Sequence, residues 1–183
     1  MTEGQLFDAA AAHYRWWQKA HGGERVYGYG FYTPPCVESA GAVVFSEEGL
    51  QQVVDRYRKH PAYATEPRRE LTRSLRWSPA DSPYCRSHDG PFEGVNETLA
   101  VISETTHALG ADDPRFVRHI NALYSALIGA LRRFRVEVLA GGERPLLSVW
   151  FGDQSEEEIA YFVRNCNAPS VADWYFKTVS EHT

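Results

Sequence analysis

A cysteine and a histidine stand three residues apart in a segment with no regular pattern. Cys85 and His88 form a Cys-x-x-His pair, and Cys36 and Cys166 lie far from it along the chain. Zinc sites use thiolate and imidazole ligands, so these residues could complete a zinc tetrahedron. Cys166, however, continues the apolar face of a predicted helix, where a buried and inert thiol is the usual outcome. We therefore predict no bound metal and no cofactor.

The same pair allows a second kind of chemistry, in which a cysteine acts as a nucleophile. Cys85 with His88 or His107 as its base has the residue types that covalent catalysis needs. The sequence contains no glycine-rich phosphate loop, no glycosidase-like carboxylate pair and no Gly-x-Ser-x-Gly elbow. Catalytic residues therefore stay unassigned.

A ring and a carboxylate also share this segment. Trp77 is followed by Ser78 and Pro79, and Asp81 comes two residues later. In one interpretation, a rigid loop presents the ring and the carboxylate to a ligand. In the other, Trp77 fills the core, Pro79 fixes φ, and Ser78 or Asp81 caps a turn. The pattern favours the structural role for Ser78 and Pro79 and leaves both roles open for Asp81.

A second ring and carboxylate mark the end of a predicted strand. Trp150 lies in an apolar run, and Asp153 follows it immediately before a predicted helix. A carboxylate in this place can accept hydrogen bonds from backbone N–H groups, bind a metal or bind an arginine of a partner. Capping is the commonest of these roles, so the pattern favours capping for Asp153.

Four arginines are concentrated in the proline-rich middle of the chain: Arg68, Arg69, Arg73 and Arg76. An anionic ligand or an acidic partner would suit them. A solvated cluster of charges is the commoner explanation, and the negative net charge argues against a nucleic-acid partner.

Bulk composition restricts the class of protein. The chain has 183 residues, of which 43% are hydrophobic and 23% charged, as is ordinary for a globular domain. A net charge of −5 argues against general nucleic-acid binding. The three widely spaced cysteines favour reduced thiols over a disulfide framework. We find neither a membrane-length apolar run nor a signal peptide, so we expect a cytoplasmic protein that does not bind membranes.

The predicted sheet is organised around residues 26–45. An aromatic and β-branched run from Val26 to Thr33 is followed by two prolines and by a second run from Ala42 to Phe45. Both runs suit strands, whereas prolines do not fit inside a central strand, so we predict an antiparallel pair. Residues 147–151 predict a buried third strand, and residues 75–78 or 136–139 predict further ones.

Apolar residues at spacings of three and four predict about six helices around this sheet. The first covers residues 3–21 and leaves His13, Arg15 and Lys19 mostly on its wet side. Ser46 and Ser155 are predicted N-caps of later helices. We therefore predict one compact α+β domain over residues 1–183, with a mainly antiparallel sheet of four to five strands.

The landmarks of this chain keep a characteristic order. They are Tyr27-Gly28-Tyr29-Gly30-Phe31-Tyr32-Thr33, Ser46-Glu47-Glu48-Gly49-Leu50, Arg76-Trp77-Ser78-Pro79-Ala80-Asp81, Phe92-Glu93-Gly94-Val95-Asn96, and Val149-Trp150-Phe151-Gly152-Asp153 leading to Asn165-Cys166-Asn167. This order resembles that of a bacterial family of small proteins, domain-of-unknown-function family 4303, over nearly the whole chain. The resemblance implies a cytosolic single domain, and some similar families serve as immunity proteins beside secreted toxins. It implies no catalytic residues, and the immunity role is an analogy.

We predict one functional surface, formed by the loop from Trp77 to Asp89 and the strand end at residues 150–153. The reason is that binding residues concentrate on loops held by a rigid sheet. The predicted binding residues are Trp77, Asp81, Tyr84, His88, Trp150 and Asp153. The leading hypothesis is a module that binds a protein partner, with an immunity-type protein of a toxin system as its specific form. The alternative is a small hydrolase-like or metal-binding enzyme that uses the loop from Trp77 to His88.

Overall fold

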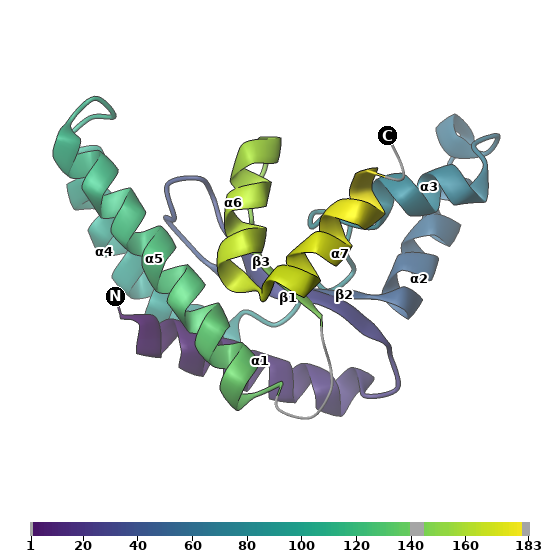
Figure 1. The fold of residues 1–183 in the computed structure, drawn as a ribbon, viewed down its shortest axis with the longest axis horizontal. Coiled ribbons are helices and arrows are strands. Elements are labelled where there is room, and N and C mark those ends of the chain that lie inside the picture. Colours follow the sequence, from purple (N-terminus) through teal and green to yellow (C-terminus); the bar gives the residue numbers. More distant parts are fainter. Residues whose placement is uncertain (1, 140–144, 181–183) are drawn as a thin grey trace.

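The computed structural model describes residues 2–139 and 145–180 (Figure 1). In these ranges the elements are α1 (Glu3–His21), β1 (Val26–Tyr32), β2 (Gly41–Ser46), α2 (Glu47–Arg58), η1 (Pro61–Tyr63), α3 (Arg68–Leu75), η2 (Gly90–Phe92), α4 (Glu93–His107), α5 (Pro114–Glu137), β3 (Leu146–Trp150), α6 (Glu156–Cys166) and α7 (Pro169–Ser180). The chain is thus an α+β domain, as predicted.

The described strands form one small mixed sheet in the order β2-β1-β3. β1 pairs antiparallel with β2 and parallel with β3. The predicted antiparallel pair is confirmed, but the prediction of four to five mainly antiparallel strands is wrong. An apolar run indicates that a strand is buried and does not indicate its direction. Here four α-helices separate β2 from β3, and long crossovers of this kind allow parallel neighbours.

The two further segments predicted as strands are not strands. Leu75 is the last residue of α3, and residues 76 and 77 form a turn. Val136 lies inside α5, which runs to Glu137. The short alternation of residues 136–139 overlaps a longer helical stripe. In that stripe Leu131, Phe134 and Val138 repeat at spacings of three and four and pack on the same core.

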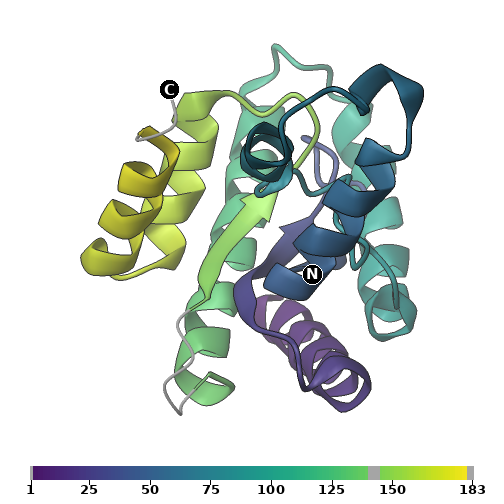
Figure 2. The same cartoon turned by 90° about the vertical axis from the view of Figure 1, so that its right-hand side faces the viewer.

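Helices cover both faces of the sheet (Figures 1 and 2). α1, α4 and α5 bury one face, and α2, α3 and α7 bury the other. α6 lies along β3 and contributes residues to both cores. Two hydrophobic cores therefore share a single three-stranded sheet.

The first core is built on the aromatic residues of β1. The Tyr29 ring stacks on Phe134 with centroids 4.7 Å apart, and Tyr14 meets Tyr29 edge-on at 5.1 Å. Tyr29, Phe31, Tyr14 and Phe134 are all fully buried. These ring pairs join α1 and α5 to the central strand.

The second core explains why glycines alternate with rings in β1. Gly28 lies beneath the side chains of Phe45 and Trp77, and Gly30 lies beneath the ring of Trp150. A Cβ atom at either glycine would be within 3 Å of these rings. The glycines therefore leave the space that rings from other elements fill.

The predicted helix starts at Ser46 and Ser155 are confirmed. Ser46 Oγ accepts a hydrogen bond of 2.9 Å from the Gly49 backbone N–H. Ser155 Oγ accepts from the Glu158 N–H at 3.2 Å, and the Glu158 carboxylate accepts from the Ser155 N–H at 2.8 Å. This reciprocal pair is a capping box, which the local sequence alone can specify.

Candidate functional site

The two predicted tryptophans meet through the second core. Trp77 and Trp150 both pack on Phe45, with ring centroids 5.7 and 5.0 Å from it. Trp150 is 3% exposed and fills the core. Trp77 is half-buried and also lines a surface hollow beside Tyr175. Of the two rings, Trp77 is the one placed to reach a ligand.

Asp81 holds its loop against α2. Its carboxylate accepts hydrogen bonds from Tyr57 Oη at 2.5 Å and from Ser78 Oγ at 2.6 Å. The bond to Asp81 is the main reason why the pKa of Tyr57 is raised. Both carboxylate oxygens are thus engaged inside the protein, and of the two open interpretations the structural one describes this geometry.

Tyr84 is buried and ties the loop to the N-terminal part of the chain. Its hydroxyl donates to Glu24, whose other oxygen accepts from Ser46 Oγ. Burial, followed by the bond to Glu24, raises the pKa of Tyr84 to about 12. The ring also lies 4.7 Å from that of His21. These contacts make Tyr84 a tie between α1, the start of α2 and the loop.

Asp153 is exposed and does not cap α6. Ser155 provides the cap, and Asp153 instead adopts a left-handed backbone conformation with φ of 56°. The expected capping role is therefore wrong. Aspartate tolerates this conformation better than most residues, which suits the turn between β3 and α6. Within residues 2–139 and 145–180, no hydrogen bond or ion pair joins Asp153 to the loop from Trp77 to His88.

In the described part of the chain, no hydrogen bond joins the Cys85 thiol to the His88 ring. Burial raises the pKa of the Cys85 thiol to about 11, so the thiol is protonated near neutral pH. The His88 ring stacks on Trp16, with centroids 4.1 Å apart and an interplanar angle of 17°. Cys166 is buried in the first core, where burial raises its pKa to about 12. The zinc set considered from the sequence is therefore not assembled.

His13, which we expected on the wet side of α1, is fully buried. The helix surface next to it is made of alanines, including Ala9 and Ala10, which let α1 approach its neighbours closely. The imidazole lies under Phe92, with ring centroids 6.2 Å apart, and its Nδ1 is 3.4 Å from Tyr29 Oη. Burial, with a smaller contribution from His88, lowers the pKa of His13 to about 4.

This shift predicts acid destabilisation. The folded pKa of His13 lies below its ordinary value of 6.5, so the unfolded chain takes up the proton first. Stability from this group is complete above pH 6.5 and falls by about 3 kcal/mol as the pH drops to 4. Urea unfolding of wild type and of His13→Phe at pH 7 and pH 4 measures it, and the variant should lose about 3 kcal/mol less than wild type. His119→Phe, on the exposed surface of α5, should retain the wild-type pH dependence, and equal pH dependence in all three proteins would contradict the prediction.

The four clustered arginines line a surface groove. Two hollows of about 400 and 650 Å³ lie between α3 and α7 and share Arg73, Arg76 and Thr178 in their walls. We call them together the α3–α7 groove. Its charged and aromatic lining residues are Arg68, Arg69, Arg73, Arg76, Trp77, Trp174 and Tyr175. The groove therefore joins one predicted site residue, Trp77, to the arginine cluster.

Acidic partners hold most of these arginines from outside the groove. Arg76 donates twice to Glu47, at 3.1 and 2.5 Å, and its guanidinium lies 4.2 Å from the centroid of the Tyr27 ring. Arg68 pairs with Asp55 at 2.6 Å. No described lining residue of either hollow is acidic. Carboxylates thus position the guanidinium groups of Arg68 and Arg76, although the carboxylates do not line the groove.

Arg73 pairs with Glu70 at 3.1 Å, whereas Arg69 forms no ion pair with any described residue. Trp174 is 43% exposed beside them. Trp174 and Tyr175 are neighbours in the sequence. Adjacent helical residues point about 100° apart, so Trp174 need not face the core that buries Tyr175. That spacing was the signal for an exposed ring in α7.

Fold and groove define the class: a small α+β domain with an arginine- and tryptophan-lined groove. None of the described helices combines the length and apolar character needed to cross a membrane. The chain belongs to a family described as a domain of unknown function (DUF4303), whose model matches residues 6–165. Comparisons with curated proteins and with solved structures found no match. The matched region includes α3 and ends before α7, so one wall of the groove lies outside it.

Proposed function

We propose that this protein is a protein-binding module and that the α3–α7 groove binds an acidic segment of its partner. The observation that supports this most directly is that four arginines and two tryptophans line one groove whose described lining contains no acid. Tryptophan, tyrosine and arginine are the residues most enriched among the energetic centres of protein interfaces. Guanidinium groups also bind carboxylates in a bidentate geometry.

Charge distribution supports the same partner chemistry. The chain carries a net charge of −5, so a cationic groove is a local exception to its overall charge. Arg69 has no carboxylate among the described residues and is available to a ligand, while Arg68 and Arg76 are held in place by their partners. A groove with preorganised cations loses less side-chain entropy when it binds.

The finer proposal is that the partner is a toxin and the protein is immunity-type. It rests on the analogy with similar families, and the groove supplies the surface on which such a partner would bind. The geometry gives little support to the alternative, an enzyme that uses the loop from Trp77 to His88. Its thiol is protonated, and Asp81 and Tyr84 are engaged in internal hydrogen bonds.

An acidic peptide should bind in the groove. We expect a synthetic peptide rich in glutamate and leucine to change the fluorescence of Trp174 on binding. Arg69→Glu should weaken this binding by more than about 1 kcal/mol, because the new carboxylate would repel the carboxylates of the peptide. Titration followed by tryptophan fluorescence, at several salt concentrations, measures both effects.

The matched control is Arg118→Glu, which makes the same change of charge at an exposed position on α5. It should leave peptide affinity within about twofold of wild type, since screened surface charges act weakly over distance. Both variants should melt close to wild type. If the two variants weaken binding equally, net charge and not the groove is responsible. If wild type does not bind the peptide, the proposed function is wrong.

A further inference from the structure

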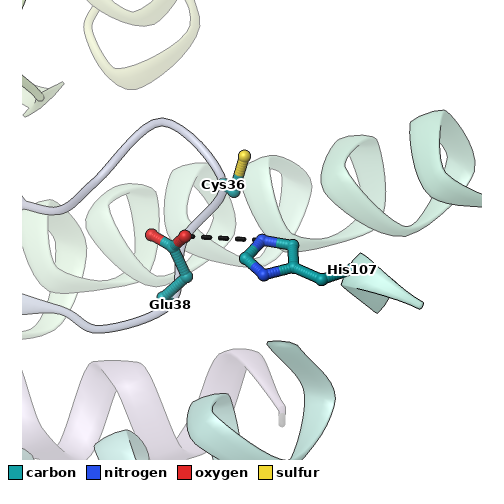
Figure 3. A group of neighbouring side chains, drawn as sticks. All are labelled: Cys36, Glu38 and His107. Carbon is teal, nitrogen blue, oxygen red and sulfur yellow. Dashed lines mark ion pairs between the residues drawn. The ribbon is translucent and has the colours of Figure 1, made fainter. Parts of the chain in front are cut away.

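Three side chains with metal-ligating atoms come together away from the α3–α7 groove (Figure 3). Cys36 and Glu38 lie in the loop between β1 and β2, and His107 is the last residue of α4. One ligand atom from each lies within 4.8 Å of the other two. His107 Nε2 is 3.4 Å from Glu38 Oε1. Cys36 and His107 are far apart in the sequence, and the fold brings them together.

We propose that Cys36, Glu38 and His107 form a binding site for a divalent transition metal, Zn²⁺ in the first place. Thiolate, carboxylate and imidazole are the three ligand types that zinc takes in proteins, and three protein ligands with a water in the fourth position form an open tetrahedral site. A sulfur ligand disfavours Ca²⁺ and Mg²⁺, which take oxygen. The donor set therefore selects the metal class.

The separation of the donor atoms fits this coordination. Bonds of about 2.0–2.3 Å in a tetrahedron place neighbouring donor atoms about 3.5 Å apart. The contact between His107 and Glu38 already has that length. A rotation of the half-buried Cys36 side chain is the adjustment that closure requires.

The backbone between the two loop ligands is unusual in a way that supports a built site. Val37 stands between Cys36 and Glu38, is 1% exposed, and has φ of 56°. A β-branched residue is rarely found in this left-handed region, and such strain persists where surrounding contacts over-determine it. Burial of the Val37 side chain in the first core leaves its two neighbours on the side of His107.

The loop is held from several directions. Thr33 Oγ1 donates to the Ser39 carbonyl at 2.7 Å within the loop. The Ala40 N–H donates to Asn96 Oδ1 at 2.8 Å, which ties the loop to α4, the helix that carries His107. Tyr124 Oη of α5 donates to the Pro35 carbonyl at 2.7 Å. The backbone that carries the ligands is thus held in place before a metal arrives, which favours affinity.

Solvent can reach the cluster. The side chains of His107 and Glu38 are 48% and 37% exposed. Metal can therefore enter and a water can complete its coordination. The surface contact between a histidine and a glutamate is by itself worth little to stability, so a stabilising role does not account for the arrangement.

Titration of the purified, metal-free protein with Co²⁺ tests the site. Co²⁺ replaces Zn²⁺ in tetrahedral sites, and a thiolate ligand adds a charge-transfer absorption in the near ultraviolet. We expect one equivalent of Co²⁺ to produce this absorption and Zn²⁺ to displace it. Cys36→Ser should abolish the absorption. His107→Ala and Glu38→Gln should each weaken metal affinity by about tenfold or more. Removing a residue that only supports a metal ligand already has an effect of this size, and removing a ligand should have at least the same effect.

Cys85→Ser is the matched control, since Cys85 is also a half-buried free thiol and lies outside the cluster. It should keep the wild-type absorption and affinity. Melting temperatures of the metal-free variants close to wild type show that the fold is intact. No thiolate absorption in wild type, or an absorption lost in Cys85→Ser and kept in Cys36→Ser, overturns the proposal. Because the groove is not involved, neither result bears on peptide binding.

Discussion

Alanine in place of Gly30 is expected to leave the protein without a stable fold. A Cβ atom at this position would lie 1.8 Å from the Ser148 carbonyl oxygen and 2.7 Å from the Trp150 ring. A ring can turn, but the carbonyl belongs to β3, which β1 holds in a parallel ladder. Separating these strands disrupts both cores. We expect a loss of about 5 kcal/mol, comparable with the total stability of many domains.

Far-ultraviolet circular dichroism and urea unfolding measure this effect. Gly94→Ala is the matched control, because nothing lies within 4 Å of a Cβ atom there. Gly94 is in the first turn of α4, where alanine is a better helix former and should raise stability by up to about 1 kcal/mol. A Gly30→Ala protein that melts within a few degrees of wild type would show that the two strands can separate locally.

Asn167→Ala is expected to lower the free energy of unfolding by about 4 kcal/mol, because buried groups left unpaired cost about 1–3 kcal/mol each. β3 is an edge strand, and Asn167 takes the place of a neighbouring strand at Leu147. Asn167 Oδ1 accepts from the Leu147 N–H at 2.9 Å, and Asn167 Nδ2 donates to the Leu147 carbonyl at 2.7 Å.

The same amide makes two further bonds. Asn167 Nδ2 donates to the Val163 carbonyl at 2.7 Å, and Oδ1 accepts from Arg135 Nη2 at 2.7 Å. All four hydrogen-bonding positions of the amide are thus used. Burial lowers the pKa of Arg135, and this charge would lose one of its acceptors in the variant.

Asn165→Ala provides the comparison for urea unfolding. Asn165 is two residues away, and its side chain donates one hydrogen bond, to the Tyr161 carbonyl in its own helix. Its replacement should cost less than about 1 kcal/mol, as for a single half-exposed hydrogen bond. Similar losses in the two variants would mean that the edge of β3 finds other partners when Asn167 is removed.

Local signals predicted much of the fold. The capping box at Ser155 and the cap at Ser46 act within one turn of a helix, so their residues suffice to specify them. The helical stripes follow from apolar spacing, which reflects the helical period, and the three strands follow from runs of aromatic, β-branched and apolar residues. The same spacing misled at Val136, where a short alternation lay on a longer helical repeat.

The surface was harder to predict, because residue type does not determine exposure. Trp150 and Tyr84 have the chemistry of binding anchors, yet both are buried by elements far from them in the sequence. His13 looked solvated on α1 and is covered by Phe92 and His88. Whether these side chains are buried depends on packing partners that lie far from them in the sequence.

The sequence by itself determined the α+β class, the family, and the helix starts at Ser46 and Ser155. The two helix starts depend on contacts within one helical turn, and the class follows from the residue pattern of the whole chain. The tertiary structure alone decided the direction of β3, the joining of Arg69 to Trp174 across the α3–α7 groove, and the meeting of Cys36 with His107. Each of these depends on which apolar faces pack together over long separations, and many pairings satisfy the same local pattern until the complete core selects one of them.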